Sequence, residues 1–186
     1  WLYREWQTLC ENISELFAIS LGLPRGFFIQ KSRRPLAQLR AAMYPPQPAR
    51  NIEGAIGCGQ HTDYGIVSII WQIDAPGLEI QDVKGRWLTA PSIPGTFICP
   101  LGDAAGIWTN DFWRPTPHRV INKSGRIRHS LAFFYDQDFE CLMKPLPQFV
   151  NASNPSRYAP TTMAEHVARG FNDTFSYRKN TAMEAI

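Results

Sequence analysis

The sequence has no long apolar run, no closely paired cysteines and no block of charge of one sign. Its hydrophobic stretches fall short of the roughly 20 residues that cross a bilayer, and no basic-then-apolar secretory signal opens it. The four cysteines are dispersed, which is typical of free thiols in a reducing compartment. The net charge is only +3, and its densest basic group (Lys31, Arg33 and Arg34) is typical of a solvated loop. We therefore expect a cytoplasmic protein without nucleic-acid or membrane partners.

The composition is that of a folded globular protein, with 44% hydrophobic and 12% aromatic residues among 186. Neither an internal repeat nor a low-complexity tract divides the chain. We expect one domain over residues 1–186, with its core at about residues 36–136, helical flanks at 1–28 and 160–178, and a monomeric state. Because the chain starts at Trp1, inside a predicted helix, we also expect further sequence upstream.

Helices are predicted at both ends of the chain. Apolar residues recur with a helical period over residues 2–21, and a glycine and a proline follow this pattern. Residues 23–28 are predicted to form a short helical turn. Near the other end, Thr162 and Glu165 have the spacing of a capping box, which predicts that a helix begins there.

The middle of the chain consists of short apolar runs separated by turn residues, a pattern typical of β-strands. The predicted strands cover residues 39–44, 62–73, 78–81, 86–89, 96–101, 117–122 and 127–136, with a helical turn at 104–109. Strands at this spacing indicate a closed β-sandwich or barrel. The expected fold class is therefore mainly β with flanking α-helices, in the form of a jelly roll.

His61 and Asp63 are candidate metal ligands. They lie two residues apart, so on an extended strand both side chains leave from the same face. A His-x-Asp pair is also common by chance, and His118 is the candidate third ligand that would complete a site. Two imidazoles and a carboxylate leave coordination positions open, as in non-haem Fe(II) oxygenases. His129 faces away from its strand neighbours and His166 lies on the C-terminal helix, so neither is an equal candidate.

Arg128 and Ser130 are candidate anion ligands. They share one face of a predicted strand that is otherwise apolar. A guanidinium holds a carboxylate through two parallel hydrogen bonds, and a hydroxyl adds a third. Two interpretations remain open: an internal salt bridge, for instance with Asp103, or a dicarboxylate cosubstrate whose other end binds the metal.

The order of these motifs resembles that in the Fe(II)/2-oxoglutarate-dependent dioxygenases of the isopenicillin N synthase-like family. The similarity runs over about residues 36–136 and, more weakly, over the flanks. In order, the motifs are His61-Thr62-Asp63-Tyr64-Gly65, Leu101-Gly102-Asp103, Trp108-Thr109-Asn110, Pro117-His118-Arg119-Val120, Arg128-x-Ser130 and Thr174-Phe175-Ser176-Tyr177-Arg178.

The resemblance implies a double-stranded β-helix in which His61, Asp63 and His118 hold iron. It also implies that Arg128 and Ser130 bind the distal carboxylate of 2-oxoglutarate, with Tyr44 as a further contact. The implied reaction oxidises a small organic molecule, most simply by hydroxylation, and converts 2-oxoglutarate to succinate and CO2. Fe(II), 2-oxoglutarate and O2 are the implied cofactors and cosubstrates, and ascorbate is a further candidate.

Family members usually carry an N-terminal domain ahead of this region, and we expect that domain to be missing here. Two other functions remain open. Some members oxidise their substrate without 2-oxoglutarate, in which case the Arg-x-Ser pair holds a carboxylate of the substrate. A truncated jelly roll that binds a metal or ligand without turnover is the alternative from another class. The primary substrate does not follow from the sequence, because the residues that select it lie on loops.

Overall fold

The computed structural model describes residues 1–47 and 57–174, so residues 175–178 of the predicted C-terminal flank lie outside the described residues. None of the described helices has the length and apolar character of a membrane span. In chain order the elements are α1 (Leu2–Ser20), the 3-10 helix η1 (Ile29–Lys31), β1 (Leu36–Tyr44), β2 (Cys58–His61), β3 (Ser68–Gln72), β4 (Leu78–Gln81), β5 (Trp87–Thr89), α2 (Asp103–Thr109), β6 (His118–Val120), β7 (Arg128–Asp136), β8 (Leu142–Met143), the 3-10 helix η2 (Pro147–Phe149), β9 (Thr161–Thr162) and α3 (Met163–Thr174).

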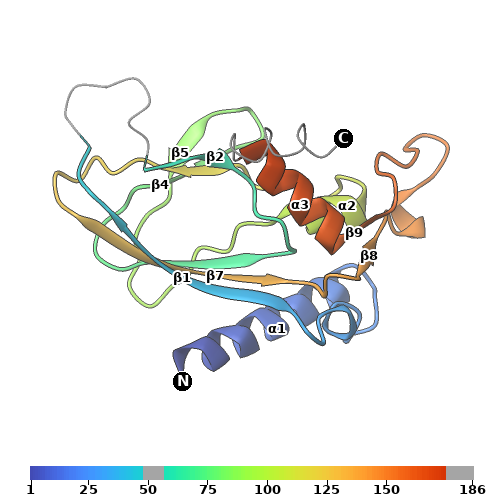
Figure 1. The fold of residues 1–186 in the computed structure, drawn as a ribbon. Helices are drawn as coiled ribbons and strands as arrows, with labels where there is room; N and C mark the ends of the chain where they lie inside the picture. Colours follow the sequence, from blue (N-terminus) through green and yellow to red (C-terminus); the bar gives the residue numbers. More distant parts are fainter. Residues whose placement is uncertain (48–56, 175–186) are drawn as a thin grey trace, which may run out of the picture.

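Two antiparallel sheets face one another and enclose the interior of the molecule (Figure 1). One sheet has the strand order β1-β7-β3, the other β2-β6-β4-β5, and β8 pairs with β9 as a small separate ribbon. The pairing of β1 with β7 runs without interruption from Leu36 opposite Asp136 to Tyr44 opposite Arg128. The predicted combination of a mainly β fold with flanking helices is therefore confirmed.

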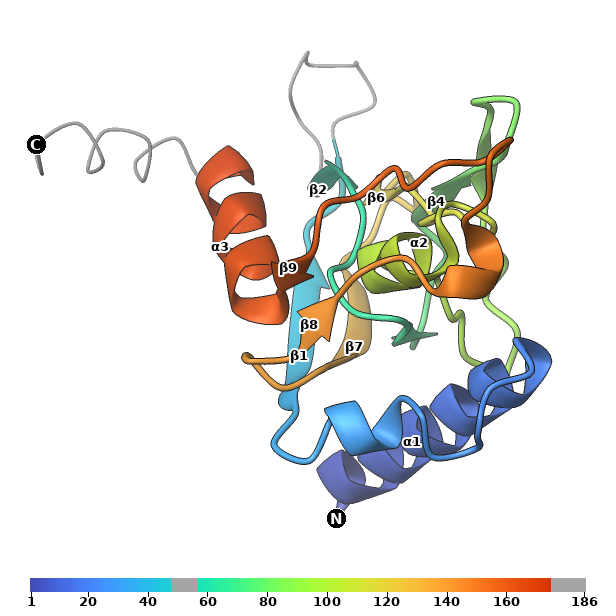
Figure 2. The same ribbon diagram turned by 90° about the vertical axis from the view of Figure 1, so that its right-hand side faces the viewer.

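The helix α1 lies across the outer face of the three-stranded sheet, and Figure 2 shows it at the foot of the molecule. Its stripe includes Trp6 and Cys10, which pack against Ile69, Phe133 and Tyr135 of β3 and β7. Burial of this apolar surface, at about 25 cal/mol per Å², is the main force that holds the helix to the sheet. The outward-facing residues of β3 and β7 are thus covered, and the alternate residues face the interior.

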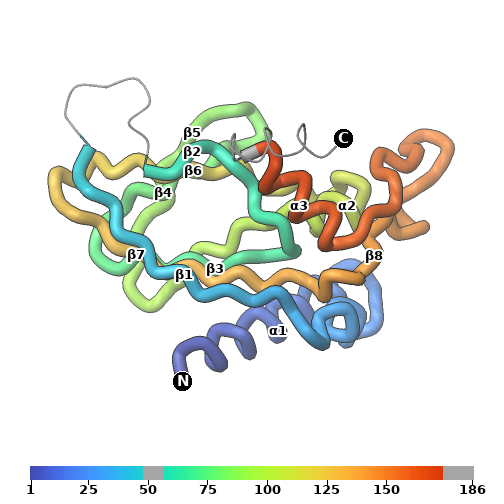
Figure 3. Tube along the Cα trace, in the orientation of Figure 1, coloured from blue at the N-terminus to red at the C-terminus, as the bar shows by residue number. Residues whose placement is uncertain are grey.

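The predicted strand at residues 62–73 is correct only over β3 (Ser68–Gln72) and wrong over residues 62–67, because β2 ends at His61 and β3 begins only at Ser68. Between them the chain crosses from one sheet to the other (Figure 3). The start of α2 holds this crossing: the Asp103 N–H donates to the Asp63 carbonyl at 2.7 Å, and the Ala104 N–H to the Tyr64 carbonyl at 3.1 Å. Carbonyls that accept from α2 in this way do not join a strand ladder.

Two other predicted elements also differ from the structure. Residues 96–101 form only isolated bridges, Ile98 with Ile70 and Leu101 with Val67, rather than a strand. The helical turn expected at residues 23–28 is replaced by hydrogen-bonded turns that lead into η1.

The predicted capping box at the start of α3 is confirmed. The Thr162 N–H donates to Glu165 Oε2 at 2.8 Å, and the Glu165 N–H donates to Thr162 Oγ1 at 3.2 Å. These bonds satisfy backbone groups that the first turn of a helix leaves without intrahelical partners. Val167, on the next turn, is buried against the core that α2 also joins.

Replacing Thr162 tests this cap. Thr162→Ala should lower the free energy of unfolding by about 1 kcal/mol, because the Glu165 amide loses its acceptor. Urea denaturation of both proteins measures this difference. Thr162→Ser keeps the hydroxyl and should unfold close to the wild type, whereas an equal loss in both variants would contradict the capping role.

Candidate active site

The structure brings His61, Asp63 and His118 together, with Asp63 and His118 buried and His61 partly exposed, although they come from three different positions in the fold. His61 is the last residue of β2, His118 is the first of β6, and the two are paired across the sheet. Asp63 follows in the crossing segment. One ligand atom from each residue lies within 4.8 Å of the other two, which is close enough for all three to bind one ion.

An irregularity in β2 makes this pairing possible. Cys58 pairs with Val120 and His61 with His118, so three residue steps on β2 match two on β6. The extra residue is a β-bulge, which reverses the alternation of side chains along the strand. As a result Cys58 and His61 lie on the same side, and Cys58 Sγ is 3.8 Å from His61 Nδ1.

Backbone carbonyls orient both imidazole rings. His61 Nδ1 lies 2.8 Å from the Gly59 carbonyl oxygen, and His118 Nδ1 lies 2.9 Å from that of Thr116. An Nδ1–H that donates to a carbonyl leaves Nε2 free to act as a ligand. Each Nε2 faces Asp63 Oδ1, at 3.8 Å for His61 and 3.7 Å for His118.

The two histidines differ in their affinity for protons. Burial lowers the pKa of His118, although the negative charge of Asp63 acts to raise it. The low pKa favours the neutral ring, which is the form that binds a metal. The contact with Cys58 is the main cause that raises the pKa of His61 to about 9. Because a metal binds the deprotonated ring, metal binding at His61 releases a proton and strengthens as the pH rises towards that value.

The carboxylate of Asp63 fits a bound cation. Asp63 is 4% exposed, and its buried Oδ2 has no hydrogen-bond partner among the described residues. An ionised carboxylate oxygen buried without a partner is unfavourable, and a divalent cation removes that penalty. The donor set of two imidazole nitrogens and one carboxylate matches the one found in Fe(II) oxygenases.

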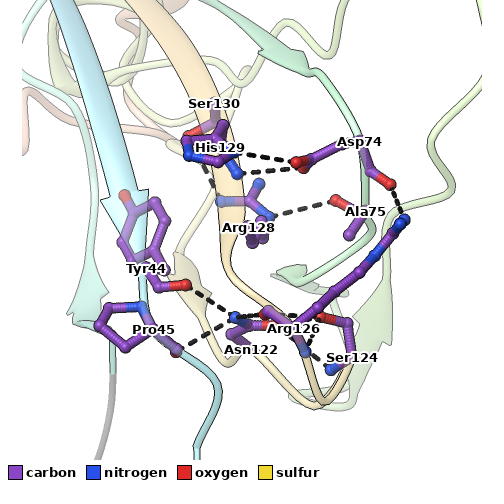
Figure 4. A network of polar contacts seen from close by, with 10 residues as sticks. All are labelled: Tyr44, Pro45, Asp74, Ala75, Asn122, Ser124, Arg126, Arg128, His129 and Ser130. Atoms are coloured by element: carbon purple, nitrogen blue, oxygen red, sulfur yellow. Dashed lines mark hydrogen bonds and ion pairs between the residues drawn. The ribbon is translucent and has the colours of Figure 1, made fainter.

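Arg128 forms a second polar centre in the interior (Figure 4). The residue is fully buried, and no carboxylate in the described part of the chain forms an ion pair with it. Its guanidinium donates to Gln72 Oε1 at 3.0 Å, to the Ala75 carbonyl at 3.3 Å and to Ser130 Oγ at 3.3 Å. The salt bridge with Asp103 is excluded, because the Asp103 carboxylate instead lies 3.0 Å from His166 Nε2.

Tyr44 completes this centre from the neighbouring strand. The guanidinium carbon of Arg128 lies 5.1 Å from the centroid of the Tyr44 ring. Burial raises the pKa of the Tyr44 hydroxyl, and Arg128 acts in the opposite direction. Arg128, Ser130 and Tyr44 therefore line one polar region, whereas His129, between the first two, points out to Asp74.

Sequence reasoning missed two amide side chains that support this region. Gln72 orients Arg128 and also accepts from the Leu78 N–H at 3.2 Å. Asn122 is fully buried and donates to the carbonyls of Tyr44, Pro45 and Arg126, as Figure 4 shows. Each joins segments far apart in the chain, and no local pattern in the sequence indicates such a contact.

The role of Gln72 can be measured directly. Gln72→Leu should lower the free energy of unfolding by about 1–3 kcal/mol, because Arg128 and the Leu78 N–H lose a buried acceptor. The matched control is Gln81→Leu, since Gln81 bonds the Gly85 carbonyl at the surface. That control should change stability by less than about 0.5 kcal/mol, and equal effects in both variants would contradict the interpretation.

Residues 35–137 match the model of the 2OG-Fe(II) oxygenase superfamily. Homoarginine-6-hydroxylase 2-ODD-C23 of Glycine max is 32% identical to the chain over 177 residues, which is 89% of this chain and 54% of the relative. Homoarginine-6-hydroxylase 2-ODD-C23.2 of Arabidopsis thaliana is 40% identical over 154 residues, covering 80% of this chain and 42% of the relative. The chain thus spans about half the length of the curated relatives that it matches.

The fold also has solved counterparts. A Neurospora crassa protein, crystallised in complex with alpha-KG and thymine, superposes with a TM-score of 0.85 at 21% identity, covering 94% of this chain and 55% of that protein. This likeness confirms the predicted double-stranded β-helix, or jelly roll. From the family match and the fold together, the chain belongs to the 2OG-Fe(II) oxygenase superfamily.

Proposed function

We propose that His61, Asp63 and His118 hold Fe(II), and that the protein uses 2-oxoglutarate and O2 to hydroxylate a small organic molecule. The main support is the cluster itself: two oriented imidazoles face Oδ1 of the buried Asp63 carboxylate, and its Oδ2 has no hydrogen-bond partner among the described residues. Iron bound there would supply the oxidising chemistry, coupled to conversion of 2-oxoglutarate to succinate and CO2. Ascorbate is a candidate reductant that keeps the iron reduced.

Arg128, Ser130 and Tyr44 would bind the distal carboxylate of 2-oxoglutarate. The guanidinium forms no ion pair with an acidic side chain in the described residues, so an incoming carboxylate does not have to displace one. The planar fork and the Ser130 hydroxyl fix the direction of the bound molecule. Gln72 holds the guanidinium of Arg128 in place, because its Oε1 accepts a hydrogen bond from Arg128 Nη2.

The interior walls would keep water away from the reacting groups. Ile70, Leu78, Ala90 and Val120 form a buried apolar cluster between the two sheets, and Tyr44 packs against it. A dry interior strengthens the hydrogen bonds to the cosubstrate and limits side reactions.

The substrate is proposed only as a class, a small organic molecule. L-homoarginine is the first compound to test, because two relatives at 32% and 40% identity are named for its hydroxylation. The cytoplasmic location, the monomeric state and the lack of nucleic-acid and membrane partners stay predictions. Cell fractionation and size-exclusion chromatography would test the first two.

Removal of a metal ligand should abolish iron binding. Anaerobic addition of Fe(II) and 2-oxoglutarate should give a weak visible charge-transfer band with the wild type and none with His61→Ala or Asp63→Ala. His129→Ala is the control, because His129 pairs with Asp74 outside the interior, and it should keep the band. A wild type without the band would favour the truncated relic, and a normal band in His61→Ala would place the iron elsewhere.

Arg128→Ala should raise the 2-oxoglutarate concentration that half-saturates this band by about tenfold or more, because a charge-assisted contact is lost. Arg126→Ala removes a surface arginine bonded to the Asp74 carbonyl and should leave the concentration unchanged.

The 2-oxoglutarate-independent alternative is tested separately, by following succinate during oxidation of L-homoarginine. Oxidation that proceeds equally without 2-oxoglutarate would overturn the main proposal.

A further inference from the structure

Two charged side chains on the inner face of the three-stranded sheet have no part in the site described above. Arg40 lies in the middle of β1, and Asp136 is the last residue of β7. The unbroken register pairs Arg40 with Ala132 and Asp136 with Leu36. Because side chains alternate along a strand, Arg40 and Asp136 share the sheet face that carries Arg128. Arg40 is exposed, so a molecule that arrives from solvent can reach it.

Neither side chain has a partner of opposite charge in residues 1–47 and 57–174, where every ion pair joins other residues. Asp136 is only 6% exposed. Its Oδ1 occupies the place where a Cβ on Gly65 would be, so glycine is required there for the carboxylate to approach the loop after Asp63. Gly65 donates a backbone hydrogen bond to this carboxyl, but its burial without an opposite charge still disfavours the ionised form, which a cation that reached it would restore.

Asp136 reaches the metal-ligand cluster through the loop that carries Asp63, because its Oδ1 lies against Gly65, two residues further along. Burial is the main cause that raises the pKa of Asp136 to about 7, and the charge of Asp63 adds to it.

The separation of the two groups follows from the register. Arg40 lies opposite Ala132, and β7 continues from Ala132 to Asp136. At about 3.3 Å per residue, these four steps separate the two positions by roughly 13 Å along the strand. The 2-oxoglutarate region at Arg128 and Ser130 lies on the other side of Arg40 along the same face.

We propose that Arg40 and Asp136 bind the two charged ends of the primary substrate, an anionic group at Arg40 and a cationic group at Asp136. This proposal rests on the proposed function, because it places the carbon chain between the two charges beside the metal ligands. The substrate class is then a zwitterion with well-separated charges, such as an amino acid with a basic side chain. A guanidinium binds a carboxylate through paired hydrogen bonds, and a buried carboxylate binds a guanidinium or ammonium group in the same way.

The experiment measures binding to the Fe(II) and 2-oxoglutarate complex under anaerobic conditions, from the change that each probe causes in the charge-transfer band. The probes are L-homoarginine, L-arginine and L-lysine, each with its methyl ester, which lacks the anionic charge. L-norleucine serves as the analogue without a cationic side chain. In the wild type at least one of the three amino acids should bind about tenfold or more tightly than both its ester and L-norleucine, because each comparison removes one charge-assisted contact.

Each variant should remove one of these preferences. Arg40→Gln should bind the acid and the ester equally and keep its preference over L-norleucine. Asp136→Asn should lose the preference over L-norleucine and keep the one over the ester. The controls are Arg33→Gln, an exposed arginine outside the interior, and Asp138→Asn, whose carboxylate accepts from the Arg34 N–H at 2.6 Å instead. Both controls should behave as the wild type does.

Three outcomes would overturn the proposal. In the first, none of the three amino acids binds the wild type more tightly than its ester. In the second, both variants keep both preferences. In the third, Arg40→Gln changes only the 2-oxoglutarate titration, which would assign Arg40 to the cosubstrate. If the Fe(II) and 2-oxoglutarate band is normal in any of these cases, the proposed function is not contradicted. If the wild type lacks the band, both the proposed function and the roles of Arg40 and Asp136 are refuted.

Discussion

Between His61 and Ser68 the chain leaves one sheet and joins the other, and the first backbone amides of α2 hold it as it crosses. The position of Asp63 depends on this crossing, because its Oδ2 has no hydrogen bond within the described residues. The two histidines are fixed differently, each by a carbonyl close by in its own segment. Asp63, the carboxylate of the cluster, is therefore positioned by backbone hydrogen bonds from a helix that comes about 40 residues later in the chain.

The interior combines groups of opposite charge that do not neutralise one another. The buried Arg128 is satisfied by an amide, a carbonyl and a hydroxyl, all of them neutral, and the carboxylate of Asp63 lies in a separate place. Burial of unpaired charge lowers stability. The same arrangement leaves each charge available to an incoming ligand, so the interior is organised for binding at the expense of its own stability.

Much of this site could be predicted from the sequence, because part of it is encoded in local spacing. The alternation along β7 correctly separated the buried Arg128 and Ser130 from the exposed His129, and the capping box located the start of α3. The course of the chain after His61 could not be predicted. An apolar run looks the same whether it continues a strand or crosses between sheets, and the difference depends on α2. Gln72 and Asn122 were missed for the same reason, since their partners are distant in the chain.

Because β2 contains a bulge, the direction in which His61 points depends on the number of residues in that strand. In a regular strand Cys58 and His61 would point to opposite faces, and the imidazole would leave the interior. The additional residue between them turns His61 inward, opposite His118. A deletion of one residue here would keep every side chain of the cluster in the sequence and yet direct one ligand to solvent. Relatives that are one residue shorter or longer at this strand are therefore expected to have lost the cluster, however similar their motifs look.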